Sequence, residues 1–313
     1  MDGLKETLVI WSAELRRAVR SGRAVVLLGL YSMFSALVLL VVGWLAGQVR
    51  EAVNKQLETA GAGADASAQV GEEMRKGVLG FLLSDDSAMM EALSRVPLEV
   101  LVVFKITLFF LPAYVALMGF DQLSGEVGPR SMRYLTVRAR RSSVLLGKFL
   151  SQATLLLGLV LIIDMAIFVY ARIANPGFGF ADVVINLIKF WLAAIVFSLA
   201  YVSLTTLCSS LFRSPAVSLV FNFILLFVFW LMDTIGRAAQ TAYSAYQVVD
   251  AYAVGEPSMM PFLRFLRYLS PSYYAGNLLH PKLAEFAASG AAYAGFAMVF
   301  LLGAYAVLRA RDL

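Results

Sequence analysis

Six long apolar stretches constrain the fold of this chain more than any other feature of its sequence. A helix that crosses a membrane needs about 20 mostly apolar residues. The stretches cover residues 24–46, 98–120, 144–170, 183–207, 216–232 and 290–308. The fifth is the shortest and leaves room for extension past Asp233. The sequence therefore predicts an all-α polytopic membrane protein, with a six-span transmembrane domain over residues 24–313.

The charge content agrees with this prediction and excludes several other classes. Only 15% of the residues are charged, whereas a soluble domain carries roughly a quarter. The sequence pI near 9.3 is typical of nucleic-acid-binding proteins, but those proteins display their charge on a polar surface that this chain lacks. Cys208 and His280 each stand alone, which excludes a disulfide scaffold and a Cys/His metal site. We expect no nucleic acid and no metal.

The distribution of charge predicts the orientation of the chain. Positively charged flanks of membrane spans stay in the cytoplasm, and an even number of spans puts both termini on one side. The side that contains the termini has 14 basic and 6 acidic residues, a net charge of +8, whereas the other side has −4. We therefore expect both termini in the cytoplasm and a location in the cytoplasmic (inner or plasma) membrane.

Residues 1–23 show an amphipathic helical pattern. Apolar side chains recur at intervals of four and three residues: Leu4, Leu8, Trp11, Leu15 and Ala18. Charged side chains are assigned to the other faces: Lys5, Glu14, Arg16, Arg17 and Arg20. The pattern predicts a helix that lies along the cytoplasmic leaflet before the chain turns at Ser21 and Gly22 into the first span.

Two segments on the non-cytoplasmic side are longer than simple connections. Residues 48–97 predict one or two short helices around a Gly/Ala-rich tip at 61–68. Residues 234–289 are aromatic, and an apolar stripe at helical spacing runs through Phe262, Phe265, Leu266 and Leu269. This stripe favours either a helix on the outer leaflet or a small packed cap.

The cytoplasmic loop after the second predicted span carries the most informative motif. It reads Phe120-Asp121, two residues, Ser124-Gly125-Glu126, a short turn and an Arg-rich stretch, followed by Leu146-Gly147-Lys148. This order resembles the membrane subunits of type-2 ABC exporters. Those permeases have an amphipathic elbow helix, six spans, both termini inside and a short cytoplasmic coupling helix. The sequence departs from many relatives at Val127-Gly128-Pro129, where they have charged residues.

The resemblance implies a permease subunit that forms the substrate path and is driven by a separate ATPase dimer. ATP and Mg would bind to that partner, and two permease chains would pair as a homodimer or a heterodimer. It implies an elbow helix that includes Trp11, Arg16 and Arg20, and a coupling loop at residues 121–143. The loop residues expected to act in ATPase coupling are Asp121, Glu126, Arg130, Arg133 and Arg138.

The arginines of this loop have two interpretations. Arg side chains hold carboxylates in fixed geometry, which suits docking to an acidic groove on a partner. They also satisfy the positive-inside rule and bind anionic membrane lipid. Glu126 is expected by analogy to lie near the elbow helix and to pair with Arg16 or Arg20.

The chain has no ATP-binding motif of its own. A P-loop ends in Gly-Lys-Ser/Thr, whereas Gly147-Lys148 is followed by Phe149. No nucleophile, acid/base pair or metal-ligand spacing marks a hydrolase site. We therefore expect no catalytic residues and no cofactor on this chain.

Ionisable residues inside the spans form another candidate site, because each is costly unless it is paired or hydrated. Lys105, Asp164 and Lys189 lie at a similar depth below the non-cytoplasmic surface, on the order of 10 Å. One hypothesis is that Asp164 pairs with either lysine, and the other is that both lysines reach outward independently. Asn222 is expected to join helices.

Two other functions remain open at this stage. An ATP-independent secondary carrier or channel would predict inverted repeats and broken helices, but we find no repeat, and Pro112 is the only proline well inside a span. A membrane scaffold that binds a partner through its outer segments is the second alternative.

Overall fold

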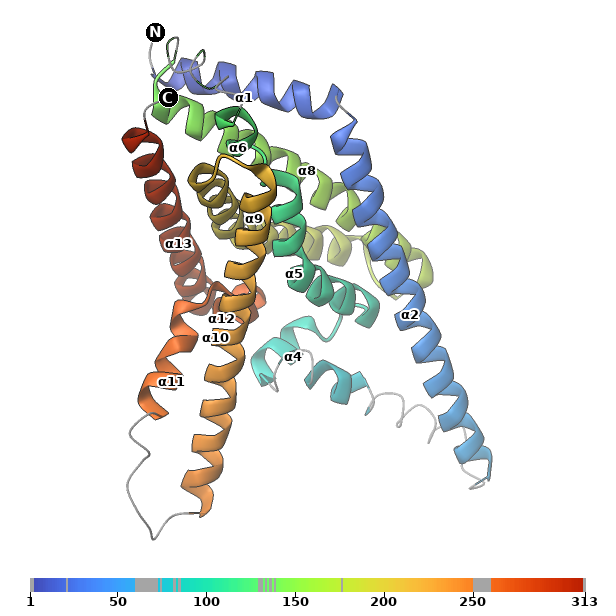
Figure 1. Ribbon diagram of the computed structural model, residues 1–313. Helices are drawn as coiled ribbons and strands as arrows, with labels where there is room; N and C mark the ends of the chain where they lie inside the picture. Colours follow the sequence, from blue (N-terminus) through green and yellow to red (C-terminus); the bar gives the residue numbers. More distant parts are fainter. Residues whose placement is uncertain are drawn as a thin grey trace.

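The protein is described by a computed structural model, and every element in it is helical (Figure 1). The described residues are 3–20, 22–59, 73, 75–80, 83, 86–128, 132, 134, 137, 139–175, 177–249 and 260–311. The expected Gly/Ala-rich tip at 61–68 lies outside them. The all-α prediction is confirmed.

The N-terminal helix α1, Gly3–Arg20, crosses the end of the bundle instead of running along it (Figure 1). Gly22 follows with φ of 72°, a left-handed conformation that glycine adopts without steric cost. The chain then turns into the long helix α2, Arg23–Thr59. Leu4 and Leu8 are 75% and 47% exposed, as expected for side chains that face a membrane.

Four long helices form the interior of the molecule. They are α5 (Leu98–Gly119), α8 (Arg141–Ala174), α9 (Phe180–Leu211) and α13 (Leu283–Ala310). Helix α9 packs against the other three. The ring centroid of Phe190 on α9 lies 4.4 Å from that of Phe104 on α5 and 5.6 Å from that of Phe168 on α8. Aromatic contacts and apolar burial hold these helices together.

Helix α10, Pro215–Val249, lies at the edge of this group and exposes large apolar side chains such as Val220 and Phe227. Helices α5, α8, α9, α10 and α13 are long and apolar enough to cross a membrane. The predicted span at 24–46 lies inside α2, whose described apolar stretch is shorter, Leu28–Val41. The polytopic prediction is confirmed, and α10 continues well beyond Asp233.

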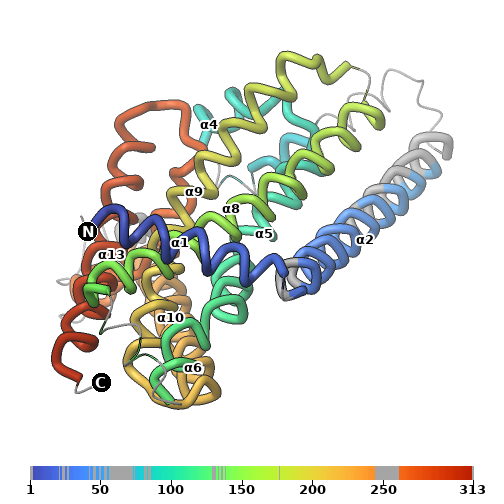
Figure 2. The backbone as a smooth tube through the Cα atoms, turned by 90° about the horizontal axis from the view of Figure 1, so that it is seen from above, coloured from blue at the N-terminus to red at the C-terminus, as the bar shows by residue number. Residues whose placement is uncertain are grey.

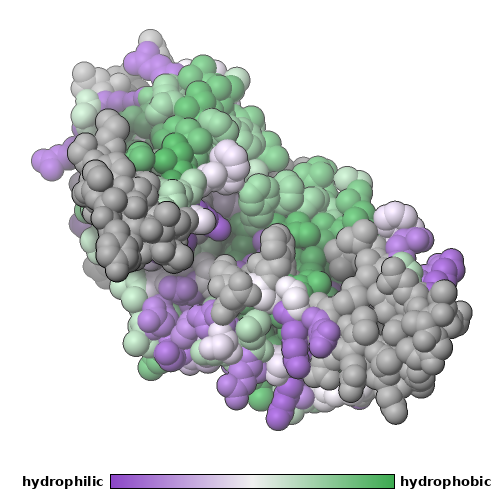
Figure 3. All heavy atoms as spheres, turned by 90° about the horizontal axis from the view of Figure 1, so that it is seen from below, coloured by the Kyte–Doolittle hydropathy of each residue, from purple (hydrophilic) through white to green (hydrophobic). Residues whose placement is uncertain are grey.

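Short helices cover the end of the molecule opposite the termini. They are α4 (Ser87–Leu93), α11 (Met260–Leu266), η1 (Arg267–Leu269), α12 (Pro271–Tyr274) and η2 (Ala275–Leu279). Viewed from this end, hydrophilic side chains gather beside large apolar patches (Figure 3). Phe262, Phe265 and Leu269, three residues of the apolar stripe predicted for this segment, are exposed.

The N- and C-terminal ends of the chain lie at the same end of the molecule (Figure 1). The short helix α6, Ser124–Val127, lies there, directly after α5. A small apolar core forms at this end from Leu123, Val127, Met132, Val144, Leu145, Ala304 and Leu308. Leu123, Val127 and Met132, described residues of the loop after the second predicted span, therefore pack where α8 begins and α13 ends.

Candidate functional site

Close packing of α1 on α8 builds the candidate site, and a glycine permits it. Figure 2 shows α1 lying along the first part of α8. A Cβ atom at Gly147 would lie 2.8 Å from Cβ of Ile10 and 3.0 Å from the carbonyl oxygen of Thr7. Any larger residue would push the two helices apart. The glycine of the Leu146-Gly147-Lys148 motif is thus the contact point for the N-terminal helix.

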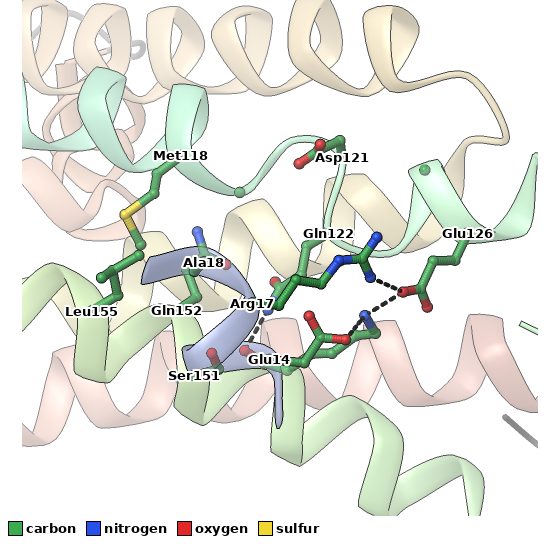
Figure 4. Close-up of a pocket in the computed structure, with 13 residues that line it drawn as sticks. Glu14, Arg17, Ala18, Met118, Asp121, Gln122, Glu126, Ser151, Gln152 and Leu155 are labelled. Atoms are coloured by element: carbon green, nitrogen blue, oxygen red, sulfur yellow. Dashed lines mark hydrogen bonds and ion pairs between the residues drawn. The ribbon is translucent and has the colours of Figure 1, made fainter. Parts of the chain in front are cut away.

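The next residue, Lys148, joins three helices through its ammonium group. Its Nζ atom lies 2.7 Å from Oε1 of Glu14 on α1 and 2.8 Å from Oε1 of Glu126 on α6 (Figure 4). The side chain of Lys148 is only 2% exposed. A buried ammonium is stable only when carboxylates pair with it. We call Glu14, Glu126 and Lys148 the junction triad.

Arg17 adds a weaker contact to the junction triad. One of its guanidinium nitrogens lies 3.6 Å from Oε1 of Glu126, and its side chain is 74% exposed. Exposed ion pairs of this length contribute at most about 1 kcal/mol to stability. Arg17 therefore adds positive charge to the edge of the site more than it fixes the geometry.

Helix α6 is held in place from the other side by α9. The hydroxyl oxygen of Ser209 accepts hydrogen bonds from the backbone N–H groups of Leu123 and Ser124, at 2.8 and 3.0 Å. These are among the N–H groups that a helix start leaves without intrahelical partners. A Cβ atom at Gly128 would lie 2.8 Å from the carbonyl oxygen of Arg213, so the end of α6 also packs closely on the chain after α9.

The start of α8 is tied to α1 and to the C-terminal end of α13. A carboxylate oxygen of Glu6 accepts a hydrogen bond from the backbone N–H of Arg140 at 3.2 Å. This bond lowers the pKa of the Glu6 carboxyl. The Arg141 guanidinium donates to the carbonyl oxygens of Leu308 and Arg309, at 2.8 Å each. A cation at a helix C-terminus is favoured by the helix dipole.

A cavity of about 310 Å³ lies beside the junction triad, between α1, α5, α6 and α8 (Figure 4). Its lining residues are Glu14, Arg17, Ala18, Met118, Gly119, Asp121, Gln122, Gly125, Glu126, Lys148, Ser151, Gln152 and Leu155. Among the residues that the structure describes, no group of three or more His, Cys, Asp or Glu is arranged to hold a metal ion. The polar lining suits hydrogen bonding and charge pairing.

The structure brings some of the predicted loop residues to this site. Glu126 belongs to the junction triad and Asp121 lines the cavity. Glu126 lies against the N-terminal helix as expected, and Lys148 and Arg17 are among its partners, whereas Arg16 donates within its own helix. Three further predicted coupling residues, Arg130, Arg133 and Arg138, lie outside the described residues.

The predicted residues of the N-terminal helix have local roles. The indole N–H of Trp11 donates to the hydroxyl of Thr154 on α8 at 3.1 Å. Arg16 donates to the carbonyl oxygen of Ser12 in its own helix at 3.2 Å, and Arg20 is exposed. Trp11 therefore adds to the packing of α1 on α8, whereas the two arginines face outward.

Of the two hypotheses for the ionisable residues inside the spans, an ion pair of Asp164 with either lysine is not found among the described residues. Asp164 is buried, and its Oδ2 atom has no hydrogen-bond partner there, while Lys105 is half-buried and Lys189 is exposed. Similar depth along three helices does not make their side chains face one another. Asn222 is fully buried and donates to the hydroxyl of Thr205 at 2.9 Å, which joins α10 to α9.

Sequence reasoning missed two polar clusters. Glu14 was assigned to an outer face of the N-terminal helix, although it follows Trp11 by three residues and shares its face. At the other end, the carboxylate of Asp233 accepts from Arg237 on the next turn at 2.9 Å and from Arg267 at 3.3 Å. The sequence does contain a signal for this second cluster: Asp233 lies at the end of an apolar run, and arginines follow it.

The geometry is that of a helical membrane protein with an amphipathic N-terminal helix fixed to the loop after its first interior helix. A search among curated proteins finds no match. The sequence model of the ABC-2 family transporter proteins matches residues 8–311. Because this match covers nearly all of the 313 residues and agrees with the membrane architecture, the chain belongs to the ABC-2 transporter family, as a membrane permease component.

Proposed function

We propose that this chain is the permease subunit of an ATP-binding cassette exporter with six spans and both termini in the cytoplasm. A separate ATPase dimer binds ATP and Mg and drives it through the coupling loop, residues 121–143. Two permease chains, identical or related, enclose the substrate path. The loop begins at Asp121, two residues after the end of α5, and ends in the first turn of α8.

The observation that carries this proposal is the buried junction triad. Lys148 holds α6, the first turn of the loop, to α1 and α8 through two short ion pairs. Ser209 holds the same turn to α9. A displacement of the loop is therefore transmitted to α1, α8 and α9 through short polar contacts. This is the arrangement that mechanical coupling to a partner requires.

Purification from the native membrane in mild detergent tests the proposal. We expect a P-loop ATPase to co-purify in stoichiometric amount, with ATP turnover that vanadate inhibits. A secondary carrier or a membrane scaffold would purify without it. Reproducible absence of an ATPase, at a protein yield that shows an intact permease, would refute the ATP-driven function.

Charge reversal in the loop tests the coupling surface. Replacing Arg130 and Arg133 with Glu is expected to release the ATPase or to uncouple its turnover, while the protein stays in the membrane. Arg95→Glu is the matched control, because Arg95 is exposed next to α4 at the opposite end. If the control releases the ATPase and the loop variant does not, the docking surface is not this loop.

A further inference from the structure

A cluster of basic side chains lies where α5, α10 and η1 meet, toward the end of the molecule opposite the termini. Arg237 on α10 and Arg267 on η1 both donate to the carboxylate of Asp233, at 2.9 and 3.3 Å. Lys105 on α5 lies close enough to Arg237 for the two charges to repel each other. We call these three basic residues the cation cluster. With Asp233 it has three positive charges and one negative charge, an excess of two.

Lys105 is the member of the cation cluster that has no ion-pair partner among the described residues. It is half-buried, and the described charge that acts on its ammonium is that of Arg237, which has the same sign. Glu99, in the first turn of the same helix, lies about 240° around the helix axis from it. An ammonium within a membrane is costly unless it is paired or hydrated. The cluster therefore lacks an anion.

Close packing fixes the two arginines of the cation cluster. A Cβ atom at Gly236 would lie 2.6 Å from Cβ of Arg267, so η1 lies directly on α10. Cζ of Arg267 also lies 4.5 Å from the ring centroid of Tyr273. Arg237 donates to Asp233 through Nε and Nη2, and its side chain is 59% exposed. Its Nη1 group thus remains to donate to a ligand.

Exposed aromatic side chains lie beside these donors, nearer to the middle of the spans. Phe109 follows Lys105 by four residues on α5 and is 64% exposed. Trp230 precedes Arg237 by seven residues on α10 and is 45% exposed. Residues at these spacings share a helix face. Because α5 runs away from this end of the molecule and α10 runs toward it, both aromatic side chains lie deeper than the cations (Figure 1).

We propose that the cation cluster binds the phosphate group of an anionic membrane lipid. The Lys105 ammonium and Nη1 of Arg237 donate to the phosphate oxygens, which favour charged donors. The acyl chains then pack on Phe109 and Trp230. A zwitterionic lipid brings its own cation to a cluster that already has excess positive charge. A soluble phosphate would leave the aromatic side chains uncovered.

The proposed orientation of the chain puts this lipid in the non-cytoplasmic leaflet. Only that choice of leaflet rests on the proposed function. Binding of the lipid to the purified chain needs neither ATP nor a partner, so its failure would leave the ATPase experiment unaffected, and the reverse also holds.

Titration calorimetry on the full-length chain in a non-ionic detergent tests the proposal with three probes. They are dihexanoyl phosphatidylglycerol, dihexanoyl phosphatidylcholine and glycerol 3-phosphate. We expect the anionic lipid to bind at least tenfold more tightly than either of the others, the loss that one charged hydrogen bond produces. Equal binding of the two lipids would overturn recognition by charge. Equally tight binding of glycerol 3-phosphate would overturn the lipid as the occupant.

Variants locate the binding. Lys105→Met removes a donor but no hydrogen bond among the described residues, and it should weaken phosphatidylglycerol roughly tenfold. Lys189→Met, at an exposed lysine of similar depth on α9, is the matched control and should bind unchanged. If Lys105→Met fails to fold, Arg237→Gln decides, because it removes the Nη1 donor. Unchanged binding in the folded variant would contradict the assignment to this cluster and place the lipid elsewhere.

Discussion

The ammonium nitrogen of Lys148 lies 2.8 Å from Oε1 of Glu126, and the two residues join the start of α8 to the turn that follows α5. The pair is separated by only 22 residues, but Glu14, which completes the triad, is 134 residues away from Lys148. A local ion pair between α6 and α8 is thus extended to the N-terminal helix.

Lys148→Met is expected to destabilise the protein strongly. The change leaves two carboxylates close together in a site where the lysine was 2% exposed. Breaking a buried ion pair by removing one partner costs about 3 kcal/mol or more. Thermal unfolding of the detergent-purified chain measures the effect. Lys189→Met, at an exposed lysine on α9, is the control and should change the midpoint little.

The same experiment separates pairing from simple loss of packing. Adding Glu126→Gln to Lys148→Met removes one of the two carboxylates that are left unpaired. The double variant should therefore be less destabilised than the sum of the two single variants. Additive effects would mean that Lys148 and Glu126 stabilise the junction independently.

Gly147→Ala is expected to push α1 away from α8. The new Cβ would meet Cβ of Ile10 and a backbone oxygen, neither of which is a flexible side-chain end. Overpacking of this kind costs about 1–3 kcal/mol. A lowered melting temperature, together with faster hydrogen exchange in residues 3–20, would show it.

Gly158→Ala is the matched control on the same helix. A Cβ atom there would meet nothing within 4 Å, and alanine is favoured over glycine inside a helix by about 0.5–1 kcal/mol. The control should therefore be as stable as the wild type or more so. A similar loss in both variants would place the effect in α8 itself and not in its contact with α1.

Acid should weaken the N-terminal cap of α4. The backbone N–H of Met89, followed by that of Ala88 and by His280, lowers the pKa of the Asp86 carboxyl below its usual 3.8. His280 lies 3.2 Å from this carboxylate. A carboxyl whose folded pKa is lowered stabilises the fold above its unfolded pKa, and this stabilisation is lost as the pH falls through the lowered value.

The difference in melting temperature between wild type and Asp86→Ala tests this cap. It should shrink as the pH falls below about 4, near the unfolded pKa of Asp. Asp86→Asn keeps a good capping side chain without the charge. It should be more stable than Asp86→Ala at every pH. A difference that grows below that pH would contradict the assignment.

The apolar patterns predicted the helices well because each pattern is local. The run at 98–120 is α5, Leu98–Gly119, and the amphipathic repeat at the N-terminus is α1, Gly3–Arg20. Polar partners were predicted less well, because a pairing depends on rotation and packing between distant segments. Lys148 was named as part of a motif and counted as a charge, but the sequence does not show that Gly147 brings Glu14 within its reach.

The sequence left the pairing of Asp164 undecided for the same reason. The depth of Asp164 follows from helix rise, but the direction of its side chain depends on how α8 rotates against α5 and α9. The structure places Asp164 among Val100, Val103, Phe104, Ile167, Phe168 and Phe190. Lys189 is exposed on α9 instead. To exclude an ion pair between Asp164 and Lys189, one must also know which face of α9 is packed.

Asp233→Asn is expected to loosen the segment that follows α11. Asp233 is 3% exposed and accepts hydrogen bonds from both Arg237 and Arg267. Arg267 also lies over the ring of Tyr273, with Cζ 4.5 Å from the ring centroid. Loss of the negative charge weakens two charge-assisted hydrogen bonds, of which the more buried one, from Arg267, is worth about 1.5–3 kcal/mol. Faster hydrogen exchange in residues 267–279 would report the loosening.

Two arginine variants show which bond holds the segment. Arg267 comes from η1 and its side chain is 23% exposed, whereas Arg237 is on α10 with Asp233 and is 59% exposed. Arg267→Gln should therefore raise hydrogen exchange in residues 267–279 nearly as much as Asp233→Asn. Arg237→Gln should have a smaller effect, because an exposed pair within one helix contributes less than about 1 kcal/mol. Equal effects of the two arginine variants would show that Asp233 stabilises α10 and does not fasten η1 to it.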